Sequence, residues 1–127
     1  MSKKIIVFGA TGTLGTHIAI NLQRKGYQIY AVGHRKSDNG FFSDYNIPYY
    51  SLNIENIEQF DQLPQSDIST VLHFAGALPA TMEGYAPHKY IDSIVKGTLN
   101  VLEYTRKCGA TKIIFPQSLF DISYLFG

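Results

Sequence analysis

Short apolar runs alternate along this chain with segments in which apolar residues recur at helical spacing. The first run, residues 3–8, is rich in β-branched residues and has no period of two, which is typical of a strand buried on both faces of a parallel sheet. From Thr13 onward apolar residues recur at every fourth position, which predicts a helix that ends at Gly26. Residues 28–32 then predict a second strand, so these elements form one strand–helix–strand unit.

The same alternation continues through the rest of the chain. In chain order we expect a loop over 33–46, a strand over 49–52, a short helix over 54–63, a strand over 70–74, the longest helix over 91–108, and a fifth strand over 112–115. Strands that alternate with helices predict a parallel sheet with right-handed crossovers and helices on both faces. No repeat or linker separates a second unit, so we expect one domain over residues 1–127.

Composition narrows the class of protein. A length of 127 residues, with 45% hydrophobic and 17% charged residues, suits a single compact domain. Eleven Lys and Arg against ten Asp and Glu, with no block of like charge, argue against a nucleic-acid partner or a polybasic membrane patch. The uncharged apolar runs are only strand length, so no transmembrane helix is expected. The single cysteine suits a reducing compartment, and we expect a cytoplasmic protein.

Candidate chemistry begins directly after the first strand. Three glycines at three-residue spacing stand between this strand and the first helix, in the run Gly9-Ala10-Thr11-Gly12-Thr13-Leu14-Gly15. The first glycine allows a sharp turn, the second lets backbone amides approach a pyrophosphate, and the third lets helix and strand pack closely. A glycine turn can also join a strand to a helix without any ligand. We favour nucleotide binding because strand, glycines and helix occur together.

Three further motifs follow the glycine turn: Leu72-His73-Phe74-Ala75-Gly76, Lys96-Gly97-Thr98-Leu99-Asn100-Val101-Leu102-Glu103 and Lys112-Ile113-Ile114-Phe115-Pro116-Gln117-Ser118. In this order, and over the whole chain, the four motifs resemble the extended short-chain dehydrogenase/reductase family, the NAD-dependent epimerase/dehydratases. We therefore expect a Rossmann-type α/β fold, with about five parallel strands in the order 3-2-1-4-5 and a dinucleotide across their carboxyl ends. The C-terminal part of the family fold is missing from this sequence.

The resemblance also implies roles for individual residues. The backbone of the glycine turn would hold the pyrophosphate, and Phe74–Gly76 would run beside the adenosine and its ribose. Ser118 matches a catalytic serine that hydrogen-bonds the reacting oxygen. Asn53, followed by Ile54, stands where the family often has an aspartate that contacts adenine. The alternative for Asn53 is an N-cap for the segment that begins at Glu55.

The end of the second strand bears on the choice of cofactor. Folds selective for NAD usually place an acidic residue there to bind the ribose hydroxyls, whereas an arginine accommodates the phosphate of NADP. This chain has Gly33 at that position, followed by His34, Arg35 and Lys36. These three side chains could bind a phosphate, although a solvated basic loop is the alternative. We expect NADP rather than NAD, with NAD still possible.

The remaining histidines and the cysteine are expected to be structural. No pair of histidines has the spacing of metal ligands, so a metal site is not expected. His73 lies within an apolar strand and is expected to be a hydrogen-bonded core histidine. Cys108 ends an apolar helical stripe and is expected to be a buried thiol without a catalytic role.

The resemblance fails at the catalytic base. The family uses a tyrosine in a YxxxK pair, whose lysine lowers the tyrosine pKa for proton transfer during hydride transfer. Tyr124 is the only tyrosine after Ser118, and its partner would fall one position beyond Gly127, so we do not assign Tyr124 as the base. Ile94 also replaces an asparagine that is usual in the family.

Two explanations fit this ending: a fragment of a longer enzyme, or a naturally short protein that keeps the nucleotide-binding half. The apolar residues within 119–127 favour the fragment. The expected function is hydride transfer to or from a carbonyl or nucleotide-sugar substrate. Alternatives are a non-catalytic module that senses or binds NADP(H), and a structural remnant that binds no dinucleotide. The exposed edge of the fifth strand makes a homo-oligomer an additional expectation.

Overall fold

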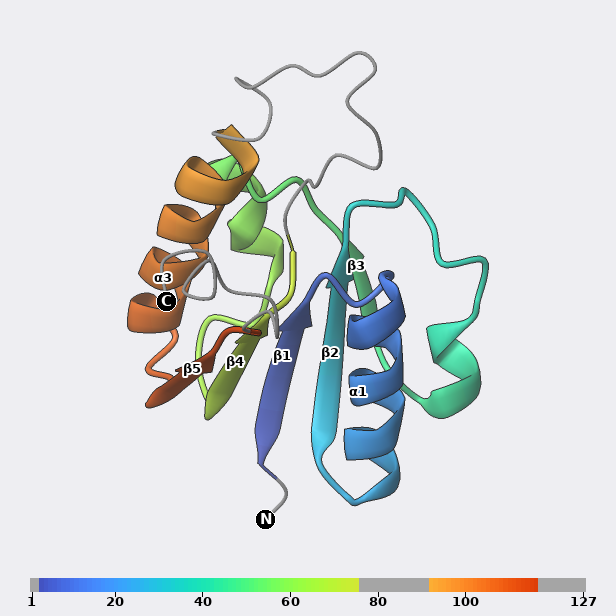
Figure 1. Ribbon diagram of the computed structural model, residues 1–127. Helices are drawn as coiled ribbons and strands as arrows, with labels where there is room; N and C mark the ends of the chain where they lie inside the picture. The colour runs from blue at the N-terminus through green and yellow to red at the C-terminus, as the bar shows by residue number, and fades with distance from the viewer. Residues whose placement is uncertain (1–2, 76–91, 117–127) are drawn as a thin grey trace, which may run out of the picture.

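The computed structural model describes residues 3–75 and 92–116, which form a sheet of five parallel strands with helices on both faces (Figure 1). The strands are β1 (Lys4–Phe8), β2 (Gln28–Gly33), β3 (Tyr49–Ser51), β4 (Thr70–His73) and β5 (Lys112–Ile114). They lie in the order β3-β2-β1-β4-β5, and each neighbouring pair is parallel. The predicted Rossmann-type strand order is confirmed.

The two α-helices in the described part of the chain lie on opposite faces of this sheet. They are α1 (Thr13–Arg24) and α3 (Gly97–Lys107), and a π-helical turn, η3 (Asp92–Lys96), leads into α3. The 3₁₀ helix η2 (Ile57–Gln62) packs on the same face as α3. Within the described ranges 3–75 and 92–116, no helix is long and apolar enough to cross a membrane.

Strand β1 shows why its sequence lacks an alternating pattern. Ile6 and Phe8 pack in the cluster beneath α3 and η2, whereas Ile5 and Val7 pack in the cluster beneath α1. All four side chains are buried. Because both faces of a central parallel strand are covered, the four buried positions after Lys4 are all apolar and show no alternation.

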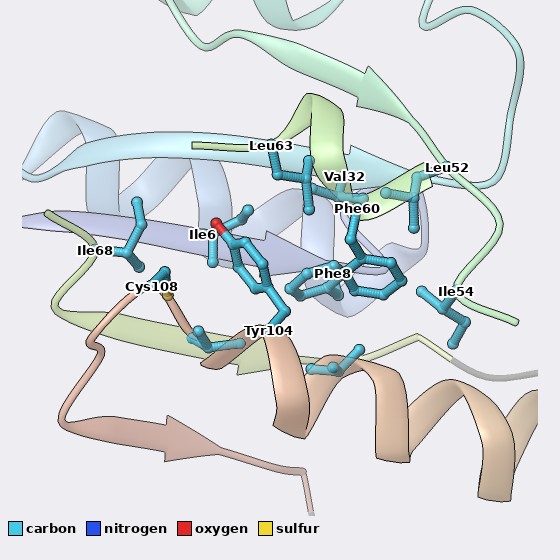
Figure 2. Packing of buried hydrophobic residues seen from close by; sticks show 12 residues of the cluster. Ile6, Phe8, Val32, Leu52, Ile54, Phe60, Leu63, Ile68, Tyr104 and Cys108 are labelled. Atoms are coloured by element: carbon cyan, nitrogen blue, oxygen red, sulfur yellow. The ribbon is translucent and has the colours of Figure 1, made fainter. Parts of the chain in front are cut away.

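Aromatic contacts join α3 and η2 to the sheet (Figure 2). The Phe8 ring stacks on Phe60 of η2 with 5.8 Å between centroids, and the Tyr104 ring of α3 lies 5.9 Å from each of them. The Tyr104 hydroxyl donates a hydrogen bond to the Pro64 carbonyl oxygen at 2.5 Å. These contacts fix η2 and the residues that follow it against β1 and α3.

The expected loop over 33–46 contains a short helix that the sequence analysis missed. The 3₁₀ helix η1 (Phe42–Tyr45) forms because Phe42 is buried against the sheet and the Asp38 carboxylate accepts hydrogen bonds from the amides of Gly40 and Phe42, at 3.2 and 2.8 Å. The helix ends at Asn46 in the left-handed conformation, with φ of 60°.

Other expectations differ at their boundaries. The helix expected over 54–63 begins only at Ile57, where the Asn56 side chain accepts a hydrogen bond from the Glu58 amide. The expected longest helix proves to be a π turn followed by an α-helix of 11 residues, one residue shorter than α1 with 12. The first helix ends as predicted, with Gly26 at a φ of 100°.

Candidate functional site

A cavity of about 550 Å³ opens at the carboxyl ends of the central strands. Residues that follow β1, β2, β3 and β4 line it, which is where open parallel sheets bind ligands. The predicted cofactor-binding residues among its lining are Gly9, Thr11, Gly12, His34, Asn53, Ile54, Phe74 and Ala75. The fold therefore brings together residues that lie far apart in the sequence.

Two glycines of the turn are required by the fold itself. Gly9 has a φ of +82°, and a Cβ atom there would lie 2.6 Å from the Phe74 carbonyl carbon. A Cβ atom on Gly15 would collide with the Gly9 carbonyl oxygen and lie 2.9 Å from the Gly9 carbonyl carbon. Only glycine allows the left-handed turn after β1 and the close approach of α1 to that turn.

Gly12 differs from Gly9 and Gly15, because neither its backbone conformation nor its packing requires a glycine. Its φ of −78° and ψ of 168° are ordinary extended values, and the nearest atom to an added Cβ would be the Gly9 oxygen at 3.4 Å. A side chain at this position would instead stand at the exposed start of α1, where Gly12 lines the cavity. The missing side chain leaves this edge of the cavity open to a ligand.

The N-terminus of α1 faces this opening without a side-chain cap. Gly12 is the N-cap residue, and it makes no side-chain hydrogen bond to the first turn. Helix geometry offers no intrahelical acceptor to the amides of Thr13, Leu14 and Gly15. These N–H groups and the positive end of the helix dipole favour an anion at this point. Thr13 and Leu14 do not line the cavity, and the groups that they offer to an anion at this point are their backbone amides.

The side chain of Asn53 is engaged in a turn on the opposite wall of the cavity. Its Oδ1 atom accepts a hydrogen bond from the backbone amide of Glu55 at 3.0 Å, and the backbone amide of Asn53 donates to Gln59 Oε1 at 2.7 Å. The expectation of a helix N-cap is wrong in one respect, because the helix begins later and Asn56 is its cap. Asn53 caps the preceding turn and also lines the cavity.

Helix α3 holds Ile54 in the same wall. The Ile54 carbonyl oxygen accepts a hydrogen bond from Asn100 Nδ2 at 2.8 Å. The Ile54 side chain packs against buried Gly97, where an added Cβ atom would lie 2.5 Å from Ile54 Cδ1. Gly97 and Asn100 both belong to the motif over residues 96–103, which signals their importance in the sequence but not these contacts.

The three basic residues after β2 separate in space. His34 lines the large cavity, whereas Arg35 lines a second cavity of about 200 Å³. Lys36 is exposed and contributes to the lining of neither cavity. Thr11 borders both cavities, so they adjoin at this residue.

A side chain at Gly33 would require neighbouring side chains to shift. A Cβ atom there would lie 2.6 Å from Thr11 Cγ2 and 2.7 Å from the Tyr49 hydroxyl oxygen. The position at which NAD-selective folds place a carboxylate is therefore filled by Thr11 and Tyr49. This gives a packing reason for the missing acidic residue.

His73 is buried, as expected, but only one of its ring nitrogens has a partner. Nε2 lies 3.2 Å from Thr98 Oγ1, whereas Nδ1 has no hydrogen-bond partner among residues 3–75 and 92–116. The rings of Phe8 and Phe115 pack against the imidazole. Burial lowers the pKa of His73, because the charged form loses its hydration. The expectation of a fully hydrogen-bonded histidine is wrong for the described part of the chain.

Two candidate residues, Gly76 and Ser118, lie outside the described residues.

Over the described ranges no group of His, Cys, Asp and Glu side chains is arranged to hold a metal ion. Cys108 is buried, as predicted, with its Sγ atom 3.6 Å from the Thr105 carbonyl oxygen.

Comparison with known proteins decides the family. The model of the NAD dependent epimerase/dehydratase family matches residues 5–121. The chain belongs to this family. Among its relatives in the family, UDP-glucose 4-epimerase from Neisseria meningitidis serogroup C is 32% identical over 125 residues, an alignment that covers 91% of this chain and 37% of the relative.

Solved structures agree with this membership. The crystal structure of UDP-glucose 4-epimerase from Bifidobacterium longum in complex with NAD+ and UDP is 28% identical, with a TM-score of 0.78 over 92% of this chain and 37% of the other. L-threonine dehydrogenase from Clostridium difficile, 23% identical with a TM-score of 0.76, shares the fold. The chain itself spans about 37% of the length of the UDP-glucose 4-epimerases that it matches.

Proposed function

We propose that this chain binds a nicotinamide dinucleotide, with the pyrophosphate at the start of α1 and the adenosine in the large cavity. The observation that carries the proposal is Gly12, whose backbone geometry and packing would tolerate a side chain. Its missing side chain gives a ligand access to the uncapped amides of the first turn. Asn53, Ile54 and Ala75 would form the apolar and polar walls around the adenosine.

The residues present fit such a cofactor. Anionic phosphates suit the amides of Thr13 and Leu14, and an adenine ring suits a largely apolar cavity of this size. When bound, the dinucleotide supplies the site that accepts or donates a hydride. The part of the chain described here binds and orients the dinucleotide, and Ser118 would hydrogen-bond the reacting oxygen.

The whole protein would transfer a hydride to or from a carbonyl or nucleotide-sugar substrate. This part of the proposal is supported by family membership and by the similarity to UDP-glucose 4-epimerases. The described residues contribute the nucleotide-binding half of that activity.

We further propose that NADP(H) binds more tightly than NAD(H). A carboxylate at position 33 would repel the ribose phosphate of NADP, and this chain has none there, because the side chains of Thr11 and Tyr49 lie where the side chain would start. His34 and Arg35 lie at the two adjoining cavities, where either could meet a phosphate on the ribose.

Titration calorimetry with NADPH and NADH tests both proposals. The unsubstituted chain is expected to bind both, NADPH more tightly, and Gly12→Val is expected to abolish binding of both. Circular dichroism of the variant should remain that of the folded chain. Retained affinity in the folded Gly12→Val variant would refute the pyrophosphate site.

The proposed preference for NADPH over NADH is tested separately, by removing the positive charge of Arg35. Arg35→Gln should weaken NADPH binding and leave NADH binding unchanged. Arg106→Gln is the matched control, because Arg106 is exposed on α3 and paired with Glu103, apart from both cavities. Equal or tighter binding of NADH by the unsubstituted chain would overturn the preference for NADP.

A further inference from the structure

Tyr49 connects strand β3 to the basic loop that follows β2. Its hydroxyl donates a hydrogen bond to the Arg35 carbonyl oxygen at 2.6 Å, across 14 positions of sequence. Tyr49 stands opposite Ala31 in the register of the two parallel strands. The hydrogen bond therefore reaches beyond the end of β2 and holds the loop at its second residue.

The tyrosine ring is itself held in place. It stacks on Phe42, with 5.8 Å between centroids and 8° between ring planes, and Phe42 is buried. The hydroxyl oxygen closes the space above Gly33, together with Thr11. Because Thr11 borders both cavities, the hydroxyl lies next to the point at which the cavities adjoin.

The charges around the hydroxyl belong to the same loop. Burial raises the pKa of Tyr49, the Asp38 carboxylate raises it further, and the Arg35 guanidinium lowers it. A tyrosine hydroxyl is protonated at neutral pH even at its ordinary pKa, and the raised pKa favours the same form, so the hydroxyl is a hydrogen-bond donor. Both charged side chains are close enough to act on the hydroxyl, and both line the second cavity.

We infer that Tyr49 is a positioning residue for cofactor choice: its hydroxyl fixes the Arg35 backbone, and thereby keeps the arginine side chain at the second cavity to meet a phosphate on the dinucleotide ribose. This inference rests on the proposed function. It adds a residue that would touch neither the pyrophosphate nor the adenine, and that acts on the ribose end through Arg35.

Tyr49→Phe tests the inference because it keeps the ring on Phe42 and removes only the hydroxyl. Tyr50→Phe is the matched control, since Tyr50 is the next residue of β3 and its ring packs near Tyr30 in the other cluster. The first readout is amide hydrogen exchange of residues 35–39 without any dinucleotide. Exchange is expected to accelerate in Tyr49→Phe and to stay unchanged in Tyr50→Phe.

The second readout is the ratio of the NADPH and NADH dissociation constants. Losing one positioning hydrogen bond should weaken NADPH binding by about two- to tenfold and leave NADH binding unchanged. An equal loss for both dinucleotides, or an unchanged ratio, would overturn the inference. If the unsubstituted chain binds neither dinucleotide, the proposed function fails, whereas unchanged exchange in Tyr49→Phe shows that the tether itself is wrong.

Discussion

Gly12→Ser should make the chain more stable and weaken its binding of dinucleotide. Gly12 is the N-cap of α1 and already has the extended φ and ψ that a capping serine adopts. An added Cβ atom would make an ordinary contact, 3.4 Å from the Gly9 oxygen. The introduced hydroxyl can therefore accept a hydrogen bond from an amide of the first turn, which is the group that we assign to the pyrophosphate.

In Gly12→Ser the gain in stability should be much smaller than the loss of affinity for the dinucleotide. Serine is favoured over glycine at an N-cap by a few tenths of a kcal/mol, which corresponds to a rise of about 1 °C in Tm for a domain of this size. A hydrogen bond to a charged group contributes about 1.5–3 kcal/mol, so removing one amide from the pyrophosphate should weaken NADPH binding by about tenfold to a hundredfold. Thermal unfolding by circular dichroism and calorimetric titration measure the two quantities.

The variant Gly12→Ala distinguishes the effect of the capping hydroxyl in Gly12→Ser from the effect of the added Cβ atom. Alanine adds the same Cβ atom but cannot cap, so the variant should be less stable than the unsubstituted chain and should lose less affinity than Gly12→Ser. A raised Tm together with unchanged NADPH affinity in Gly12→Ser would refute the assignment of the first-turn amides to the pyrophosphate.

Three further predictions concern stability. Gly15→Ala should lower the free energy of unfolding by about 1–3 kcal/mol in urea denaturation, because the added Cβ collides with the Gly9 carbonyl group. Tyr104→Phe should lower it by about 1–2 kcal/mol in the same assay, because the Pro64 carbonyl loses its hydrogen-bond donor, and an unchanged midpoint would contradict this. The lowered pKa of His73 means that the unfolded chain binds its proton more readily, so stability should be complete above about pH 6.5 and should fall as pH drops below this value. Denaturation at several pH values should show a smaller fall in His73→Gln, and an equal fall would mean that other groups cause it.

Much of the fold follows from local pattern. The run over 3–8 predicts a strand covered on both faces because its last four residues are consecutive apolar residues, and the structure buries residues 5–8 in two clusters. The helix from Thr13 to Arg24 follows from apolar residues at every fourth position and from the glycine that stops it. The order of the strands could not be read from periodicity and came from the family resemblance, since period alone says nothing about which strands pair.

The missed features depend on contacts between distant residues. The helix η1 forms because Phe42 is buried against the sheet, which no local propensity of its polar surroundings indicates. Asn100 reaches the Ile54 carbonyl across 46 positions, and Tyr49 reaches Arg35 across 14. Such contacts exist only after the sheet has brought β3, α3 and the end of β2 together, so a single sequence carries no pattern for them.

The missing side chain at Gly33 matters for charge and for packing. In the sequence its significance is electrostatic, because no carboxylate stands there to repel a phosphate. In the structure it is also steric, because Thr11 and Tyr49 occupy the space of a side chain. Position 33 therefore lacks the usual partner of the ribose hydroxyls, and the selectivity that we propose depends on groups that reach the cavities. Among those groups are His34 at the large cavity and Arg35 at the second, and Tyr49, which lies against Gly33, also holds the Arg35 backbone.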